Sequence, residues 1–186
     1  DDRIKIKNSY FSEEIVEEIV SEYGQVDMIM ANNVYAHIQD IQGTTRAVES
    51  ALADNGVFVL EVHYLGKVIE ELQYDMIYHE HLYYYSLLSA IEHFKHYNMV
   101  VFDLKLVPIH AGSLRLYVGK ECSKHALKVS DAVKLLAEEE RTKSYDKFWV
   151  FREFANEVAK TKEDLIFLLK KLKLEGKTIA GYGASG

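Results

Sequence analysis

The stretch Val26–Asn33 reads VDMIMANN, a run of mostly apolar residues that ends in a pair of asparagines. A second apolar run, GVFVLEVHY, covers Gly56–Tyr64. Such runs are typical of strands that are buried on both faces of a parallel sheet. Between them, TTRAVESALADNG (Thr44–Gly56) predicts a helix closed by a turn. Together they predict a strand–helix–strand unit, and this unit decides the fold.

The flanking segments extend this alternation in both directions. Upstream, RIKIK (Arg3–Lys7) alternates like a half-buried strand, and Ser12 is a suitable N-cap for an amphipathic helix that Gly24 ends. Downstream, Leu87–Asn98 predicts another amphipathic helix. Two further strands, VVFDLKLVP and SLRLYVG, are separated only by the loop Ile109–Gly112, which predicts a hairpin. We therefore expect an α/β fold: a parallel sheet with helices on both faces and one antiparallel edge.

The composition shifts after Lys120 towards long, charged, helical segments. Ser130–Glu140 and Tyr145–Lys173 contain neither glycine nor proline. Four leucines of the second segment recur at helical spacing and form one stripe: Leu165, Leu168, Leu169 and Leu172. We expect a helical arm that either packs on the sheet domain or links it to a following domain.

The last ten residues, KTIAGYGASG, predict a strand and a glycine-rich loop that would open such a further domain. This division gives a sheet domain over residues 1–120, an arm over 121–175 and the start of a third unit over 176–186. GYGASG also fits G-x-G-x-x-G, a weak signal on its own for a dinucleotide site. The abrupt start and end suggest a fragment of a longer protein.

Composition excludes several classes of protein. The 186 residues are 48% hydrophobic and 27% charged, which is typical of a soluble globular protein. A net charge of −7 argues against a nucleic-acid binder, which needs a basic surface. The single Cys122 rules out an internal disulfide or a cysteine-cluster zinc site and favours a cytoplasmic location. No apolar run reaches the roughly 20 residues of a membrane-spanning helix, so we expect no membrane partner.

Polar and aromatic residues gather where the predicted strands end. Ala31–His37, Glu61–Gly66 and Tyr78–His81 all follow apolar runs. Ligands of open parallel sheets bind at the carboxyl ends of the strands. The loop between the last two strands could face the same rim, so we expect these segments to form one site.

The stretch Ile77–Ser86, IYHEHLYYYS, allows three interpretations. Histidines two residues apart converge poorly on a metal, and HExxH is absent, so we expect no metal site. The tyrosines could instead line a core with their hydroxyl groups at water. A histidine that titrates near neutral pH, beside a carboxylate and a tyrosine, could also act in acid–base chemistry. The residue types alone leave the structural and the catalytic interpretations open.

Other single residues are equally ambiguous. Asn32 and Asn33 could cap a turn or contact a ligand. His37 lies within reach of the same rim, although a lone histidine is more often structural. Arg115 could contact an anion or lie at the surface.

Several of these motifs, taken in order, resemble the S-adenosylmethionine-dependent sugar C-methyltransferases, which act on nucleotide-linked keto-deoxysugars. The motifs are VDMIMANNVYAHIQDI, NGVFVLEVHYL, IYHEHLYYYSL, VPIHAGSLRLYV and GKTIAGYGASG. ANNVYAH and the Y-x-E-H core are the most specific, and the resemblance covers essentially the whole chain. It implies S-adenosylmethionine as methyl donor and a Rossmann-like class I methyltransferase sheet, here without its first strand and glycine loop. It places zinc only in an N-terminal domain that this chain lacks.

The resemblance also implies a reaction. A base removes the C3 proton next to a C4 ketone, and the enolate attacks the sulfonium methyl group. The implied roles are His81 as base, Glu80 as its carboxylate neighbour and Tyr78 as hydrogen-bond donor. Since Glu80 and His81 would diverge on a strand, these roles require an irregular turn.

The remaining implied contacts are with the sugar and the methyl donor. The resemblance places His37 at the pocket wall, His110, Ser113 and Arg115 near the sugar, and Ala31 and Asn32 beside the methyl donor. Three alternatives stay open: an O- or N-methyltransferase on the same scaffold, a nicotinamide-dependent oxidoreductase, and a non-catalytic binding fragment.

Overall fold

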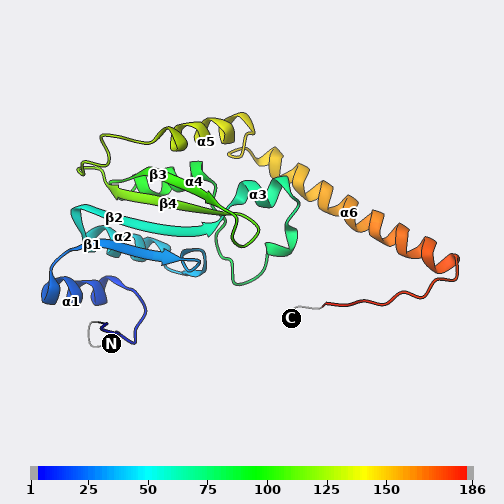
Figure 1. Cartoon of the computed structure of the whole chain (residues 1–186), viewed down its shortest axis with the longest axis horizontal. Helices are drawn as coiled ribbons and strands as arrows, with labels where there is room; N and C mark the ends of the chain where they lie inside the picture. Colours follow the sequence, from blue (N-terminus) through cyan, green and yellow to red (C-terminus); the bar gives the residue numbers. More distant parts are fainter. Residues whose placement is uncertain (1–3, 184–186) are drawn as a thin grey trace.

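A computed structural model describes residues 4–183. Its centre is a four-stranded sheet in the order β1–β2–β4–β3 (Figure 1). The strands are β1 (Val26–Asn32), β2 (Leu52–His63), β3 (Met99–Val107) and β4 (Ser113–Lys120). β1 and β2 are parallel, and α2 (Ile41–Ala51) connects them. The prediction of an α/β fold with a strand–helix–strand unit is therefore confirmed.

The connecting helix begins and ends earlier than predicted. The Asp40 side chain accepts a hydrogen bond from the Gly43 amide at 2.9 Å and caps the helix, which then begins at Ile41. At the other end, Leu52 already pairs with Val26 in the sheet. The register shifts in the next few residues, so the predicted turn is instead an irregular start of β2.

The predicted hairpin is present and forms one antiparallel edge of the sheet. β4 is antiparallel to both β2 and β3 and lies between them, so the outer strand is the first strand of the hairpin. Leu114, Leu116 and Val118 of β4 are fully buried, and a central position provides apolar neighbours on both sides. β3 takes the edge, where its Lys105 and Leu106 are exposed.

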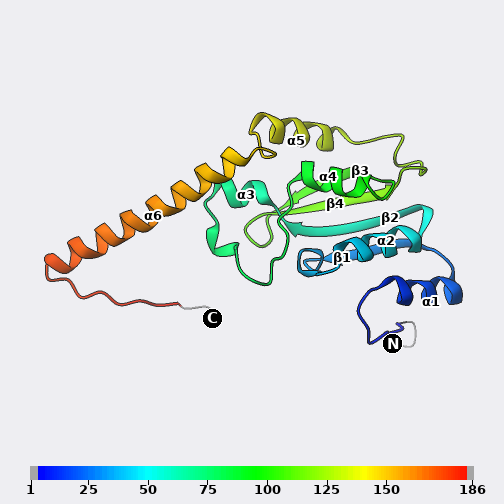
Figure 2. The same ribbon diagram turned by 180° about the vertical axis from the view of Figure 1, so that it is seen from behind.

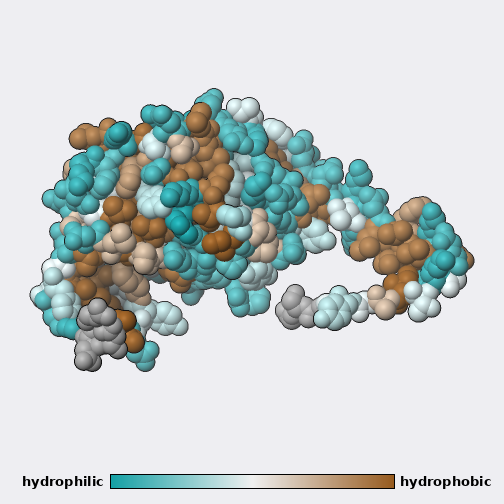
Figure 3. Space-filling view, in the orientation of Figure 1, coloured by the Kyte–Doolittle hydropathy of each residue, from teal (hydrophilic) through white to brown (hydrophobic). Residues whose placement is uncertain are grey.

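Helices cover one face of the sheet, whereas the sequence predicted helices on both. α2, α4 (Leu87–Lys95) and α5 (Asp131–Thr142) supply residues to the main core, and α2 and α4 lie before the sheet in Figure 2. On the opposite face, Met28 and Met30 are 58% and 66% exposed, and hydrophobic residues show at the surface in Figure 3. An apolar run predicts burial on both faces, but no helix within residues 4–183 covers this second face.

The predicted strand over Arg3–Lys7 is not formed at residues 4–7. Ile4 and Ile6 are exposed, and Lys7 forms an ion pair of 2.8 Å with Glu18 of α1 (Glu13–Tyr23). Alternation alone does not make a strand without a neighbouring strand to pair with. The helix itself is confirmed, including its Ser12 cap and its end at Gly24.

Three short elements that the sequence did not predict build the approach to the site. They are the 3₁₀ turns η1 (Tyr35–His37) and η2 (Tyr74–Met76) and the helix α3 (Leu65–Glu70). η1 follows β1, and α3 and η2 lie between β2 and the stretch that holds Tyr78 and His81. Elements of one or two turns carry too little periodicity to be recognised in a sequence.

The predicted arm is helical but does not pack on the sheet. α6 (Phe148–Leu174) projects away from the sheet domain in Figures 1 and 2. Leu165 and Leu168 of its stripe are 53% and 49% exposed, so packing on the sheet domain was the wrong alternative. Its role as a link to a following domain stays a prediction.

The predicted strand in the final segment is not formed, since residues 177–183 have no regular structure. The last glycine of the G-x-G-x-x-G match, Gly186, lies outside the described residues. Over the described range, no helix combines the length and the apolar character needed to cross a membrane.

Candidate active site

A cavity of about 190 Å³ lies at the carboxyl ends of β1 and β2. Four segments that are distant in sequence line it: Asn33 and His37 after β1, His63 at the end of β2, Tyr78 and His81 of the aromatic stretch, and His110 of the β3–β4 loop. The prediction that the strand-end segments and this loop meet at one rim is therefore confirmed. The catalytic roles of these residues stay predictions.

A tight turn brings Tyr78 and His81 together. The His81 amide donates to the Tyr78 carbonyl at 3.1 Å, which closes a turn of four residues. The two rings lie side by side with their centres 4.2 Å apart. The irregular turn that the implied roles require is therefore present, but it brings His81 to Tyr78 and not to the Glu80 carboxylate.

The hydrogen bonds of His81 determine which nitrogen is basic. Its Nδ1 lies 3.0 Å from the Met76 carbonyl oxygen, which can only accept, so Nδ1 carries the proton. In the neutral ring Nε2 therefore has the lone pair. The Tyr78 hydroxyl lies 3.0 Å from Nε2 and donates to it. The basic nitrogen of His81 is thus paired with a hydroxyl group that lines the same cavity.

Glu80 takes part through its main chain. Its side chain is exposed, and its carbonyl oxygen accepts from His37 Nδ1 at 2.8 Å. Among the described residues, the Glu80 carboxylate makes no hydrogen bond with His81, and the Met76 carbonyl holds the position predicted for it. The reason is the turn, which directs the Glu80 side chain to solvent. The contact from Glu80 also fixes His37, leaving its Nε2 as an acceptor.

His63 is a buried cavity residue that the sequence reasoning did not single out. Its Nε2 lies 3.0 Å from Oε1 of Gln73. The Gln73 amide nitrogen donates to the Ala111 carbonyl at 2.9 Å and to the Glu71 carboxylate at 2.8 Å, so its oxygen faces His63. His63 Nε2 must therefore donate, and Nδ1 has the lone pair. Burial lowers the pKa of His63 and keeps the ring neutral.

The sequence does contain a signal for His63. It is the last residue of the second apolar run, and alternation along a strand places it on the same side as Glu61. A polar residue at the carboxyl end of a central strand is a good candidate for a ligand contact.

The β3–β4 loop holds His110 in a left-handed conformation. His110, Ala111 and Gly112 have φ angles of 49°, 58° and 116°, a strained run that its neighbours hold in place. The Gly112 carbonyl accepts from the Tyr64 amide at 3.1 Å. Ser113, predicted to contact the sugar, is fully buried, and its hydroxyl donates to the Ile109 carbonyl at 3.0 Å. In this structure Ser113 supports the loop.

Arg115, predicted as a substrate contact, pairs with a buried carboxylate beside the cavity. Its Nε and Nη2 lie 2.9 and 2.7 Å from Oε2 of Glu61, which is 3% exposed. The other oxygen of Glu61 accepts from the Asn33 side-chain amide at 3.3 Å. The pair thereby helps to hold Asn33, which has a φ of 52°.

Ala31 and Asn32, the predicted methyl-donor contacts, end β1 next to the cavity. Ala31 packs against the core beside Leu60, whereas the Asn32 side chain is exposed. A second cavity of about 700 Å³ lies nearby and is lined by Tyr10, Phe11, the start of α1 and the turn into α2. His37 lines both cavities, so they adjoin at this ring.

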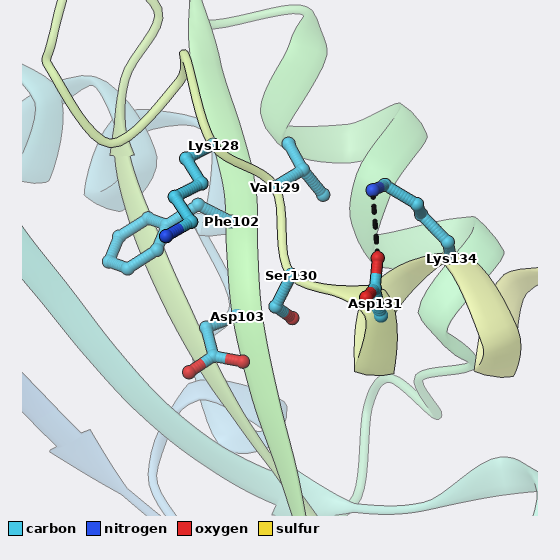
Figure 4. Close-up of a pocket in the computed structure, with 7 residues that line it drawn as sticks. All are labelled: Phe102, Asp103, Lys128, Val129, Ser130, Asp131 and Lys134. Atoms are coloured by element: carbon cyan, nitrogen blue, oxygen red, sulfur yellow. Dashed lines mark hydrogen bonds and ion pairs between the residues drawn. The ribbon is translucent and has the colours of Figure 1, made fainter.

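A third cavity lies away from this rim, between β3 and the start of α5 (Figure 4). It measures about 260 Å³, and its Lys134 and Asp131 form an ion pair of 3.0 Å. Ser130 in its wall is the N-cap of α5. None of the predicted site residues lines it. Over the described residues, no three or more His, Cys, Asp or Glu side chains form a group able to hold a metal ion.

Comparison with known proteins shows the family of this chain. A family model described as a methyltransferase domain matches residues 2–104, and a model described as the C-methyltransferase C-terminal domain matches residues 108–186. The C-methyltransferase NovU of Streptomyces niveus is 32% identical over 174 residues. That match covers 94% of this chain but only 41% of NovU.

Two solved structures match part of this chain with low scores. Magnesium protoporphyrin IX methyltransferase of Synechocystis PCC 6803 gives a TM-score of 0.40 at 10% identity, over 52% of this chain and 45% of that one. M1.HpyAVI gives 0.37 at 15% identity, over 62% and 55%. The family model that covers more than half of the chain is the more direct finding: this chain belongs to the methyltransferase domain family, and over most of its length it is similar to a C-methyltransferase.

Proposed function

We propose that this protein transfers a methyl group from S-adenosylmethionine to C3 of a nucleotide-linked 4-keto-6-deoxysugar, by way of an enolate. One observation carries the proposal: His81, held in one tautomer by the Met76 carbonyl, has its basic nitrogen beside the Tyr78 hydroxyl at a cavity. Deprotonation of a carbon next to a ketone needs a base and a hydrogen-bond donor in this arrangement. The similarity to a C-methyltransferase supports the same chemistry.

The first step is proton transfer to His81. Nε2 takes the C3 proton, and the electron pair of the C–H bond moves into the enolate. The Met76 carbonyl, 3.0 Å from Nδ1, stabilises the imidazolium that forms. A carbonyl acceptor replaces the carboxylate of a typical base–carboxylate pair, so the ring keeps its tautomer without an added negative charge.

Proton transfer to His81 also requires a change of partner for Tyr78. Nε2 has a single lone pair, so the Tyr78 hydroxyl turns away from it before the C3 proton is transferred. The hydroxyl can then donate to the ketone oxygen as negative charge develops on it. Substrate binding thus exchanges the hydrogen bond between Tyr78 and His81 for one between Tyr78 and the reacting ketone.

The larger cavity suits the methyl donor. Its volume of about 700 Å³ lies within the range of small-molecule sites, and it adjoins the His81 cavity at His37. Tyr10 and Phe11 in its wall offer apolar and aromatic surface. When bound, S-adenosylmethionine supplies an electrophilic methyl group. Ala31 and Asn32 line neither cavity, so their contact with the methyl donor stays a prediction.

The smaller cavity suits the reacting end of the sugar. Its volume of about 190 Å³ admits part of a hexose, and His37 and His110 lie in its wall. Ser113 and Arg115 act on the sugar site indirectly, through the loop and through Asn33.

The domain division and the cellular location are further proposals. The division into a sheet domain (1–120), an arm (121–175) and a third unit (176–186) is supported by the end of β4 at Lys120. A cytoplasmic location rests on cysteine usage. An oxidoreductase stays an alternative that only the GYGASG match favours, and residues 177–183 form no strand before it.

The test follows the C3 proton. The full-length protein is incubated with the 4-keto-6-deoxyhexose nucleotide in heavy water, with an unreactive methyl-donor analogue, and exchange is measured by NMR. We expect loss of the C3 signal with wild type and with His79→Ala, a matched control because His79 is exposed in the same turn. His81→Ala should reduce the rate by at least about 100-fold. Exchange that does not depend on His81 would refute its role as the base. No exchange above the uncatalysed background would refute the enolate mechanism and favour an O- or N-methyltransferase.

A further inference from the structure

Two buried side-chain polar atoms within the described residues lack a hydrogen-bond partner: His63 Nδ1 and Ser123 Oγ. Of these two residues, only His63 lines the cavity that holds His81. Buried polar groups are paired in the great majority of cases, so an unpaired one beside a candidate active site needs an explanation.

The unpaired nitrogen, Nδ1 of His63, can only accept a hydrogen bond. Gln73 holds the Nε2 proton of His63, and Gln73 is itself fixed by Ala111 and Glu71. Nδ1 is therefore an acceptor. It can pair with a hydroxyl or an N–H group, but it cannot pair with a ketone or phosphate oxygen, which are acceptors as well. Because His63 is only 7% exposed, its pKa is lowered and the ring remains an acceptor.

The position of His63 relative to His81 indicates which group of the substrate donates a hydrogen bond to Nδ1. The centres of the two rings are 6.4 Å apart, close enough for one hexose ring to reach both. In the proposed reaction, C3 faces His81 and the C4 ketone faces Tyr78. The group on the other side of C3 is the C2 hydroxyl, which is a hydrogen-bond donor.

We propose that His63 is a specificity-determining residue whose Nδ1 accepts a hydrogen bond from the substrate hydroxyl next to the reacting carbon. This inference rests on the proposed function. Nδ1 has less than 1 Å² of exposed surface, so this role requires a side chain of the cavity wall to move aside as the hydroxyl docks. The site thereby distinguishes a 2-hydroxy sugar from its 2-deoxy analogue by an unsatisfied acceptor.

The test compares two substrates in the full-length protein. Rates of C3 exchange are measured with the 2-hydroxy and the 2-deoxy 4-keto sugar nucleotides, for wild type and for His63→Gln. Glutamine can keep a donor near the position of Nε2 but has no acceptor at Nδ1. Wild type should prefer the hydroxyl substrate by at least about tenfold in kcat/KM. His63→Gln should lose this preference by slowing only the hydroxyl substrate.

A second variant separates hydrogen bonding from packing. His63→Asn places a carbonyl oxygen near the position of Nδ1 and should retain part of the preference. Thermal unfolding of each variant confirms that it is folded before rates are compared.

Each outcome has a distinct meaning. Equal slowing of both substrates in His63→Gln, or no preference in wild type, would overturn the role of His63 while leaving the proposed reaction in place. No His81-dependent exchange with either sugar would refute the proposed function itself, and the inference would fall with it.

Discussion

Replacing Glu140 by alanine should strongly destabilise the sheet domain. Glu140 lies on α5 and is fully buried. Its two carboxylate oxygens accept from the amides of Leu87 and Leu88, at 2.7 and 2.8 Å, in the first turn of α4. These amides have no partner within the helix, so the carboxylate on α5 caps α4 from outside. The contact also anchors the stretch that leads out of the candidate site.

The size of the effect follows from these contacts. Each buried amide left without a partner costs about 1–3 kcal/mol. Removal of the carboxylate also relieves its own cost of burial, which offsets part of the loss. We therefore expect Glu140→Ala to lower the free energy of unfolding by about 2–4 kcal/mol. Glu140→Gln keeps one acceptor oxygen and should lose about half as much.

Urea unfolding followed by circular dichroism measures this difference. With a slope of about 2 kcal/mol per M, the midpoint should fall by about 1–2 M. Glu138→Ala is the matched control, because Glu138 lies on the same helix with its side chain 73% exposed and 3.5 Å from Arg141. It should change stability by less than about 0.5 kcal/mol. If Glu140→Ala unfolds at the same urea concentration as Glu138→Ala, the capping argument is wrong.

Three further predictions concern the site and its support. Tyr78→Phe should slow C3 exchange about 10- to 100-fold without loss of stability, because it removes only the tyrosine hydroxyl group that is hydrogen-bonded to His81. An unchanged exchange rate would count against the role of Tyr78. Gly112→Ala should lower stability by about 1–3 kcal/mol in urea unfolding, since φ is 116° and the new Cβ would lie 2.8 Å from Cγ of Lys67. Gly24→Ala, with a φ of 79° and no atom within 4 Å, should cost less. Burial lowers the pKa of His63 and His93 below 6.5, so the unfolded chain binds more protons as pH falls and stability should drop between pH 7 and 5. This slope should be smaller in His63→Gln, and an identical slope would show that His63 contributes nothing.

Local patterns in the sequence predicted much of the fold. The apolar runs gave β1 and β2, and Ser12 and Gly24 gave the ends of α1, because each signal acts within a few residues. The rim could also be predicted, since the carboxyl ends of parallel strands share one edge of a sheet. His37, Tyr78, His81 and His110 all reach that rim.

Contacts between distant residues decided the rest. The insertion of β4 between β2 and β3 depends on burying Leu114, Leu116 and Val118 from both sides. Arg115 faces a carboxylate 54 residues away, and no local pattern encodes that pair. The sequence by itself determined which segments reach the rim. Only the tertiary structure decided their chemistry, because the basic nitrogen of a histidine depends on which acceptor its other nitrogen meets.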